Sequence, residues 1–461
     1  MEKYAIVVVG GGPGGYVAAI RAAKAGRSVA LIEADELGGT CLNRGCIPSK
    51  TLLRHSEVIE HIKKAKEWGI ETGEISFSLD RMMERKNQVI QRLRTGIASL
   101  LKTNKIELYR GMGNVHPDLS IDVQAKEGQR RIQAEKVIIA TGSKPAVPNI
   151  PGIDQTPVHT SDTIFDITEI PRSLAIIGGG VIGVEFACIF ANLNVDVTII
   201  ELADRIIPTE DTDASAVLYK SLQAKDIHIL TRHQVASLRQ HGKLKEITLQ
   251  TPEGKLEKRT FDEVLVAAGR KPNMSGVENL NLRMNGSHIE VNDRLETSIP
   301  NVYAVGDVIG GWQLAHVASA EGLVAAANAA LQTEETVNYR VVPRCIYTFP
   351  EVASVGYSEH EAEKLGYRIK KTTYPLRASG KAMTMDETEG FTKVIADEKY
   401  GEILGVVIVG PHATEMISET SAFIFLEGTI EELAKLIHPH PTLSEGIFEA
   451  AHALVGHGVH L

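Results

Sequence analysis

Two cysteines, Cys41 and Cys46, lie in the segment GGTCLNRGCIPSK of a chain that contains only four cysteines. A metal site normally needs more ligands than two cysteines, usually at tighter spacing. A structural disulfide would be unusual in a chain with no predicted secretory segment and a cytosol-like use of cysteine. Because the segment closely follows a dinucleotide-binding pattern, we interpret the pair as thiols that are oxidised and reduced in each turnover. The alternative is an inert, buried pair.

The dinucleotide-binding pattern begins with an apolar run that predicts a strand buried on both faces. Three glycines follow at G-x-G-x-x-G spacing, Gly10, Gly12 and Gly15, and then an alanine-rich helix is predicted over 16–25. These glycines permit a tight turn, close approach of a pyrophosphate and close packing of the helix on the strand. A second predicted strand ends at Glu33, whose carboxylate can accept hydrogen bonds from ribose hydroxyls.

The same pattern of strand, glycines, helix, strand and acid returns at a constant offset, with Gly178, Gly180, Gly183 and finally Glu201. Its helix is predicted from about residue 184. One such glycine motif is weak evidence, whereas two complete units predict that the chain binds two dinucleotides.

The two units are predicted to bind different cofactors. A redox-active thiol pair beside the first unit favours FAD there, because flavin can pass electrons to sulfur, which a nicotinamide cannot readily do alone. The second unit is then assigned a nicotinamide dinucleotide. Glu201 favours NAD, because its charge would repel a 2′-phosphate.

The remaining pattern predicts an α/β fold with two Rossmann-like dinucleotide-binding domains, the second inserted in the first. A strand over 302–305 and a helix over 315–330, rich in small residues, are expected to return to the first sheet. From about residue 341, strands alternate with amphipathic helices, which indicates a C-terminal α+β domain. The expected limits are 1–147 and 271–340 for the FAD-binding domain, 148–270 for the NAD-binding domain and 341–461 for the C-terminal domain.

Composition excludes several partners. The net charge of −9 argues against nucleic acid and against an anionic membrane surface. No apolar run approaches the ~20 residues that span a bilayer. Because a strand is predicted at the very start, no room remains for a targeting segment, and we expect a cytoplasmic protein.

Longer sequence segments, spread over the whole chain, are typical of one protein family. They are VVVGGGPGGYVAAIRAA, GGTCLNRGCIPSK, ATGSKP, GGGVIGVE, AAGRKPN, VYAVGD, YTFPEVASVG and HPTLSE, in this order. With them the chain resembles the flavin-dependent disulfide oxidoreductases. The resemblance implies a homodimer in which the C-terminal domain is the dimerisation domain and supplies a catalytic His–Glu pair to the disulfide of the partner subunit.

The resemblance also implies roles for individual residues. Cys46 would be the thiol nearest the flavin and Cys41 the thiol that exchanges with substrate. His440 would be the acid–base, with Glu445 fixing its tautomer. The residues implied for FAD, besides the first glycine unit and Glu33, are Lys50, Gly113, Thr141, Gly142, Asp307 and Ala315. Those implied for NAD, besides the second glycine unit and Glu201, are Glu185 (as the partner of Lys50), Val235 and Gly269.

Within this family, CLNRGCIPSK resembles the lipoamide-oxidising members more than the CVNVGCVPKK pattern of glutathione-type enzymes. This resemblance implies NAD-dependent oxidation of a protein-bound dihydrolipoyl group. The implied partner is a lipoylated acyltransferase or carrier protein of a 2-oxoacid, acetoin or glycine-cleavage system. The alternative is another NAD(P)H-dependent disulfide reductase of the same family.

Other chemistry-bearing residues receive ordinary interpretations. His438 is interpreted as a surface histidine. The C-terminal histidines His452, His457 and His460 are interpreted as exposed rather than as metal ligands, and no metal site is expected. Cys188, in the apolar segment FACIF, and Cys345 are interpreted as structural thiols.

Overall fold

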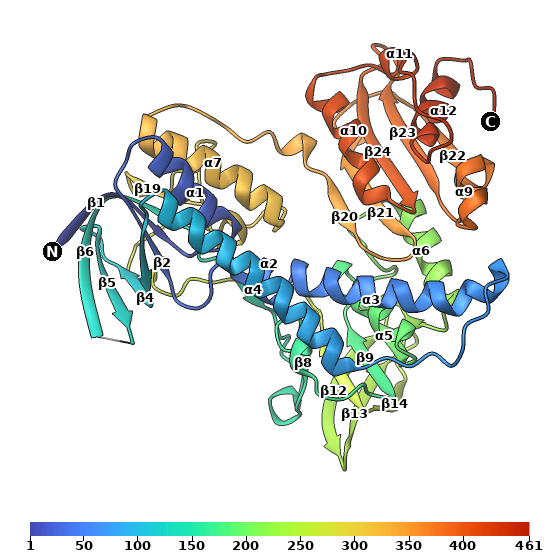
Figure 1. Cartoon of the computed structure of the whole chain (residues 1–461), viewed down its shortest axis with the longest axis horizontal. Helices are drawn as coiled ribbons and strands as arrows, with labels where there is room; N and C mark the ends of the chain where they lie inside the picture. Colours follow the sequence, from blue (N-terminus) through green and yellow to red (C-terminus); the bar gives the residue numbers. More distant parts are fainter. Residues whose placement is uncertain (127, 461) are drawn as a thin grey trace.

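The first domain is built around a seven-stranded sheet in the order β3-β2-β1-β6-β5-β4, with β19 paired to β6. We describe it from a computed structural model of residues 1–126 and 128–460 (Figure 1). Strand β1 pairs in parallel with β2 and β6, and its apolar residues are buried, as expected for a strand covered on both faces. The strands are β1 (Glu2–Val9), β2 (Val29–Glu33), β3 (Glu107–Arg110), β4 (Met112–Val115), β5 (Ser120–Ala125), β6 (Gly128–Ile139) and β19 (Val302–Ala304).

The second domain repeats this arrangement in a five-stranded sheet, in the order β11-β10-β9-β15-β8. Its central strand β9 lies between β10 and β15, as β1 lies between β2 and β6. An antiparallel layer of β12, β13 and β14 shares an apolar core with this sheet. The strands are β8 (His159–Thr160), β9 (Ser173–Ile177), β10 (Asp196–Ile200), β11 (His228–Leu230), β12 (Gln234–His241), β13 (Leu244–Gln250), β14 (Leu256–Phe261) and β15 (Glu263–Val266).

The second domain interrupts the first. The chain leaves the first domain through β7 (Ser143–Pro145) and returns through β16 (Arg270–Pro272), and these two strands pair antiparallel. Strand β19 then rejoins the first sheet, with Val302 opposite Val137. Helix α7 (Ala315–Leu331) packs on α1 (Pro13–Lys24). The predicted return to the first sheet is therefore confirmed.

The C-terminal domain is a five-stranded antiparallel sheet in the order β20-β21-β24-β23-β22. Helices α10 (Ala413–Phe425) and α12 (Glu445–Leu454) share one apolar core with one face of this sheet. The other face packs towards the second domain, so β24 is buried along its whole length. The strands are β20 (Arg344–Ile346), β21 (Glu351–Gly356), β22 (Ile369–Pro375), β23 (Phe391–Asp397) and β24 (Ile403–Gly410). The predicted fold class is confirmed.

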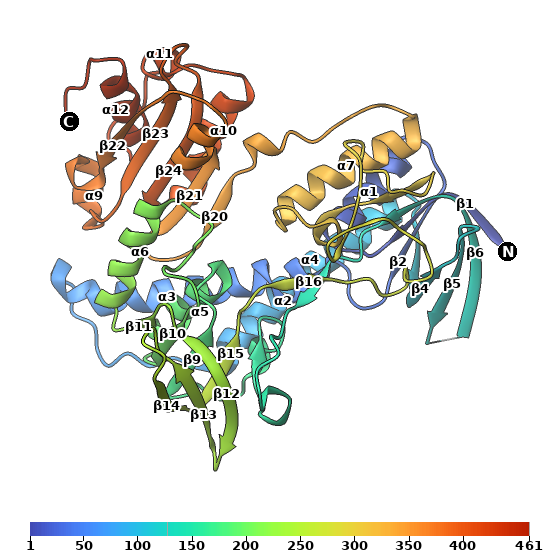
Figure 2. The same ribbon diagram turned by 180° about the vertical axis from the view of Figure 1, so that it is seen from behind.

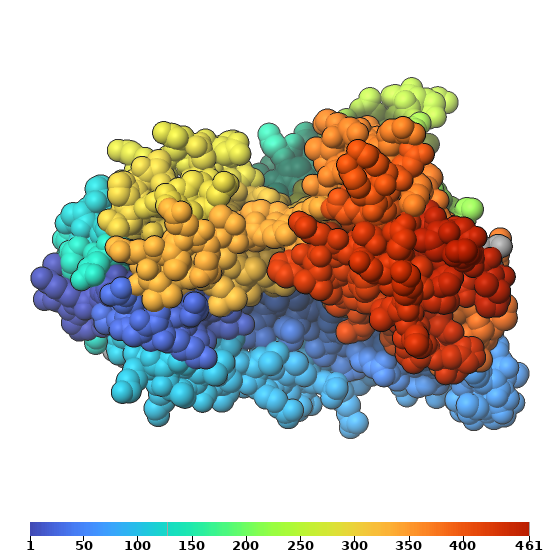
Figure 3. All heavy atoms as spheres, turned by 90° about the horizontal axis from the view of Figure 1, so that it is seen from above, coloured from blue at the N-terminus to red at the C-terminus, as the bar shows by residue number. Residues whose placement is uncertain are grey.

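Two long helices connect the domains. Helix α3 (Cys46–Lys64) packs on α5 (Val181–Asn192) of the second domain and on α4 (Leu79–Thr103). Figures 1 and 2 show α3 running below the C-terminal domain. Figure 3, a view from above, shows the blue-to-cyan segment that contains α3 and α4 along the lower edge of both halves of the molecule. None of the helices in residues 1–126 and 128–460 is long and apolar enough to cross a membrane.

Both helices that follow a glycine motif begin earlier than predicted. Helix α1 begins at Pro13 instead of residue 16, and α5 begins at Val181 instead of about 184. The physical reason is that the middle glycine of each motif, Gly12 or Gly180, is itself the N-cap, so the first helical turn lies inside the motif. The free N–H groups of that turn therefore face the space beside the glycines.

Candidate active site

The outer glycines of each motif make contacts that no other residue permits. Gly10 has φ +106°, and a Cβ there would lie 2.2 Å from the carbonyl oxygen of Ala140. A Cβ on Gly15 would lie 1.8 Å from the oxygen of Gly10. Gly178 and Gly183 repeat both contacts, at 2.4 Å from a carbonyl of the neighbouring strand end and at 2.0 Å from the Gly178 oxygen. The first and third glycines are thus required by packing alone.

The middle glycine has a different function. A Cβ on Gly180 would meet no atom within 4 Å, and one on Gly12 would meet only Gly39 at 3.8 Å. The space beside these residues is open, at the N-termini of α5 and α1 respectively. Such a position suits a pyrophosphate, because backbone N–H groups and the helix dipole both favour an anion there.

The acid at the end of each second strand closes the glycine turn. Glu33 accepts a hydrogen bond from the Gly11 N–H (2.6 Å) and one from the N–H two residues after itself (2.8 Å). Glu201 makes the same two bonds, to the Gly179 N–H and two residues onward, both at 2.6 Å. Each carboxylate oxygen keeps a second lone pair, which can accept a ribose hydroxyl. The constant offset in sequence therefore corresponds to a repeated hydrogen-bond arrangement.

One cavity of about 2030 Å³ connects both glycine turns with the cysteine pair. Gly15 and Gly183 are not among its lining residues, consistent with their packing function. Within the cavity the Thr141 hydroxyl is buried and has no hydrogen-bond partner among the described residues, so it is free to bond a ligand. The predicted residues that line it are Gly10, Gly12, Glu33, Cys41, Cys46, Lys50, Gly113, Thr141, Gly142, Gly178, Gly180, Glu185, Glu201, Val235, Gly269, Asp307 and Ala315.

The two cysteines lie at the junction of two helices. Cys41 belongs to the short helix α2 (Gly39–Arg44), and Cys46 is the first residue of α3, with Gly45 between the helices. Both are free thiols. The neighbouring Cys41 thiol lowers the pKa of Cys46 to about 7 against the opposing effect of burial, and Lys50 lowers it further. The neighbouring Cys46 thiol and burial raise the pKa of Cys41. Cys46 is thus the thiol that carries the negative charge.

Lys50 lies one helical turn after Cys46 and is held by residues from two other elements. Its amine donates to both carboxylate oxygens of Glu185, at 2.9 and 2.7 Å. Glu185 also accepts the N–H of Tyr347 at 3.0 Å, and the Tyr347 ring centroid lies 4.5 Å from the Lys50 amine. Sequence reasoning did not single out Tyr347. Its place in the segment YTFPEVASVG was the only available signal.

A second group surrounds Asp307, and sequence reasoning did not single out two of its members, Ser143 and Asp162. Ser143 donates a hydrogen bond to the Asp307 carboxylate and accepts one from the Arg270 guanidinium at 2.7 Å. Arg270 also lies 3.3 Å from Asp162. Because Ser143 and Arg270 belong to the paired strands β7 and β16, this network fixes Asp307 where the chain passes between the two domains.

His440 and Glu445 form a hydrogen-bonded pair away from the cavity. Glu445, the first residue of α12, accepts from His440 Nδ1 and from the N–H of Thr442, both at 2.8 Å. Partial burial opposes ionisation, but these bonds hold the pKa of Glu445 below its ordinary value. The His440 side chain is 80% exposed. Figures 1 and 2 place α12 and α2 far apart, so a single chain does not bring His440 to the cysteines.

The interpretation of two other histidines was wrong. The side chain of His438 is only 5% exposed and its Nε2 lies 2.9 Å from Glu419 Oε1 of α10. The ring of His452 lies 4.1 Å from that of Phe448 and is half-buried. His438 meets Glu419, which is 19 residues away in sequence, and His452 Nε2 lies 2.5 Å from the carbonyl oxygen of Ala434, which is 18 residues away. Local periodicity does not reveal contacts of this range. His457 and His460 are exposed as expected.

The His438–Glu419 pair predicts a pH-dependent stability. The hydrogen bond from Glu419 raises the pKa of His438, so the pair stabilises the fold below the unfolded-state pKa of histidine and loses this effect as pH rises through the folded-state pKa. We expect Glu419→Gln to lower the melting temperature by about 2–4 °C near pH 5.5 and by less near pH 8.5. Thermal unfolding followed by circular dichroism at both pH values tests this, and an equal decrease at both would contradict it.

The remaining cysteines differ in position. Cys188 is fully buried in α5, which confirms the prediction of a core thiol. Cys345, in β20, is half-buried and lines the cavity. Burial raises the pKa of each to about 12, so neither competes with Cys46 as a thiolate. Within residues 1–126 and 128–460, no group of three or more His, Cys, Asp and Glu side chains is placed to hold a metal ion.

Two dinucleotide turns that share a cavity with a dithiol define a disulfide oxidoreductase that uses two dinucleotide cofactors. The chain belongs to the pyridine nucleotide-disulphide oxidoreductase family: residues 4–322 match that family, and residues 342–451 match its dimerisation domain.

Similar proteins span the whole chain. The chain is 41% identical to a dihydrolipoyl dehydrogenase of Bacillus subtilis (strain 168), over 99% of both chains. It is 40% identical to one of Chlamydia muridarum, over 100% of this chain and 98% of that protein. Among solved structures, it resembles the HOCl-induced flavoprotein disulfide reductase RclA from Escherichia coli in its Cu(II) complex (TM-score 0.88, 31% identity, 98% and 100% covered). It also resembles LpdA from Mycobacterium tuberculosis (TM-score 0.90, 27% identity, 98% and 100% covered).

Proposed function

We propose that the chain oxidises protein-bound dihydrolipoyl groups with NAD, the activity of a dihydrolipoyl dehydrogenase. The observation that carries this proposal is the single cavity in which the Cys41–Cys46 pair lies between two glycine turns of equal construction. The choice of a dihydrolipoyl substrate is supported by the full-length similarity to proteins of that name.

The first glycine turn, with Glu33, Lys50, Thr141 and Asp307, would hold FAD. The buried, unpartnered hydroxyl of Thr141 and the open space beside Gly12 support this assignment. When bound, FAD would supply a two-electron carrier between the cysteine pair and NAD. The second turn, with Glu201, would hold NAD.

Disulfide exchange would proceed at Cys41. A substrate thiolate attacks the Cys41 sulfur of the oxidised pair, which forms a mixed disulfide and releases Cys46 as a thiolate. The second substrate thiol, once deprotonated, displaces Cys41 and leaves as the cyclic disulfide. The substrate has then lost two electrons and two protons, and the cysteine pair has gained the two electrons. The low pKa of Cys46 makes it the better leaving group in the first step.

His440 would accept the substrate protons, held in one tautomer by Glu445. Because His440 is exposed and far from Cys41 in its own chain, we assign it to the disulfide of the partner subunit in a homodimer. The match to the dimerisation domain supports this assembly. The physiological partner would be a lipoylated acyltransferase or carrier protein of a 2-oxoacid, acetoin or glycine-cleavage system. The cytoplasmic location remains a prediction from sequence.

Steady-state turnover tests the proposal. Purified protein should reduce NAD with dihydrolipoamide, and should show little reduction of glutathione disulfide by NADPH. The opposite preference would favour the alternative, another disulfide reductase of this family. Titration with dithionite provides an independent test: we expect a long-wavelength absorption band from a thiolate beside flavin.

Cofactor choice provides a further prediction. Replacing Glu201 with Arg removes the ribose acceptor and introduces a partner for a 2′-phosphate, so the ratio of NAD to NADP efficiency should fall by at least about tenfold. Because Glu201 also closes the glycine turn, Glu201→Gln is the matched control for the loss of charge alone. An unchanged ratio in Glu201→Arg would contradict the assignment of the second unit.

A further inference from the structure

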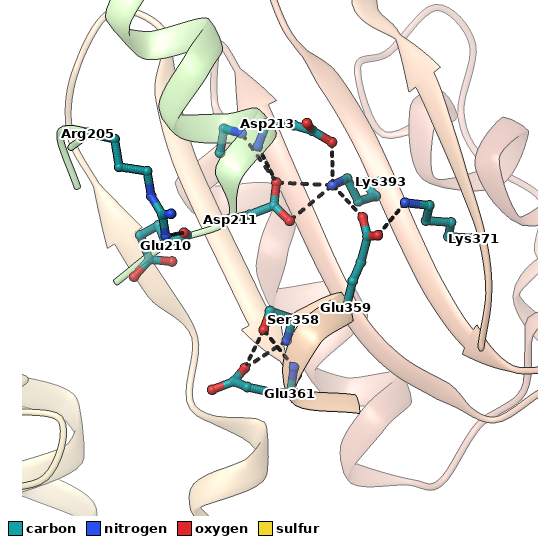
Figure 4. Close-up of polar contacts among 10 residues, drawn as sticks. Arg205, Glu210, Asp211, Asp213, Ser358, Glu359, Glu361, Lys371 and Lys393 are labelled. Carbon is teal, nitrogen blue, oxygen red and sulfur yellow. Dashed lines mark hydrogen bonds and ion pairs between the residues drawn. The ribbon is translucent and has the colours of Figure 1, made fainter. Parts of the chain in front are cut away.

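Lys393, in β23, is a buried lysine that the chemistry above does not use. Its side chain is only 2% exposed. The amine lies 3.0 Å from Asp211 Oδ2, 2.6 Å from Asp213 Oδ2 and 2.8 Å from Glu359 Oε1 (Figure 4). Glu359 begins the short helix α8 (Glu359–Lys364) of the C-terminal domain, whereas both aspartates belong to the second domain. A single ammonium group therefore joins carboxylates of two domains.

The two aspartates are fixed at the start of α6 (Thr212–Ala224). Asp211 is the N-cap of this helix and accepts hydrogen bonds from the N–H groups of Asp213 (2.9 Å) and Ala214 (3.3 Å). Figures 1 and 2 show α6 directly below the sheet that contains Lys393. Burial alone would lower the pKa of Lys393, but the bonds to the three carboxylates raise it, so the amine stays charged.

The residue before the N-cap makes a second contact with the C-terminal domain. Glu210 is buried, and its Oε2 lies 3.2 Å from Arg344 Nε and accepts the Ser354 hydroxyl at 2.6 Å. Arg205 donates to the carbonyl of Pro208 at 2.6 Å, which fixes the segment internally. Glu210 and Asp211 are therefore both anchored to the neighbouring domain.

The anchored residues end the segment 202–211, which leads from Glu201 to α6. Leu202, Pro208, Thr209 and Glu210 of this segment line the cavity. The N–H of Ile207 donates to the carbonyl of Gly179, inside the second glycine turn, at 2.8 Å. The segment thus begins next to Glu201, and its Ile207 bonds the glycine turn. Its last two residues, Glu210 and Asp211, are held by the C-terminal domain.

We propose that Lys393 is a positioning residue for the nicotinamide dinucleotide: by holding Asp211 and Asp213, it fixes segment 202–211 in the shape that NAD binds. The inference rests on the proposed function of the second unit as the NAD site. Without the ion pairs from Lys393, segment 202–211 samples other arrangements. NAD must then order the segment when it binds, which lowers the affinity for NAD. The dithiol half of the reaction does not use this segment.

The test compares two lysines that bind the same carboxylate. Lys393→Met removes the link between domains, whereas Lys371→Met removes a 52% exposed lysine that contacts Glu359 and neither aspartate. We expect Lys393→Met to raise the KM for NAD by about tenfold, with kcat and the KM for dihydrolipoamide within about twofold of wild type. Lys371→Met should leave all three unchanged. Flavin content should be unaffected in both variants.

A general loss of stability would raise the KM for NAD and the KM for dihydrolipoamide alike, whereas loss of the anchor should raise only the KM for NAD. An unchanged KM for NAD in Lys393→Met, or an equal rise in both KM values, would overturn the proposal. If Lys393→Met does not fold, Asp213→Asn weakens the same anchor through a carboxylate that is 64% exposed. The KM for NAD of this variant should also rise, by a smaller factor. An unchanged KM for NAD in Asp213→Asn would overturn the proposal. Failure of the wild-type chain to reduce NAD would instead overturn the proposed function, and this inference with it.

Discussion

Replacing Cys41 with Ser should lower dihydrolipoamide turnover at least about a thousandfold while FAD stays bound. A serine hydroxyl cannot form the disulfide that the substrate attacks, so no electrons reach Cys46. The cofactor should remain, because the glycine turn and the residues around Thr141 and Asp307 hold it without help from sulfur. Turnover and the flavin absorbance of the purified variant are the two measurements.

Cys345→Ser is the matched control for this experiment. Cys345 also presents a thiol to the cavity, but its raised pKa keeps it protonated and its sulfur lies against the Thr414 carbonyl. Most activity should therefore survive its replacement. Retention of more than about a tenth of wild-type activity in Cys41→Ser would contradict the disulfide mechanism, because loss of a nucleophile costs far more than tenfold.

Mixed dimers of two inactive variants should regain activity if the active site is shared between subunits. Cys41→Ser and His440→Gln are each expected to be inactive alone. In a heterodimer one site carries both defects and the other carries neither. With random pairing of equal amounts, half of the dimers are mixed and each has one intact site of two, so activity should reach at most about a quarter of wild type.

Co-refolding the two variants, one of them with an affinity tag, allows heterodimers to be isolated before assay. These should show about half of wild-type activity per dimer, since one of two sites is intact. The control is refolded wild-type protein, which corrects for incomplete recovery. Isolated heterodimers that remain inactive would show that His440 acts in its own chain or takes no part in the reaction.

Local sequence was enough to predict the two dinucleotide turns. The first glycine of each motif follows from its positive φ, and the third from a Cβ contact of about 2 Å with the carbonyl of the first. Both are short-range requirements of a strand–turn–helix unit. The acids at Glu33 and Glu201 follow for the same reason, since each bonds an N–H of its own turn. The spacing of Cys46 and Lys50 likewise places both on one face of α3.

Contacts between distant segments were decided only by tertiary structure. Tyr347 reaches Lys50, His438 is buried against Glu419, and Lys393 joins two domains, yet none of these follows from hydrophobic periodicity. Periodicity states which face of an element is apolar, but it does not state which other element covers that face or which polar group meets it there. Residue types and spacing were therefore enough to predict the chemistry of the cavity. The residues that orient Lys50 and those that link the domains depended instead on how the three domains pack.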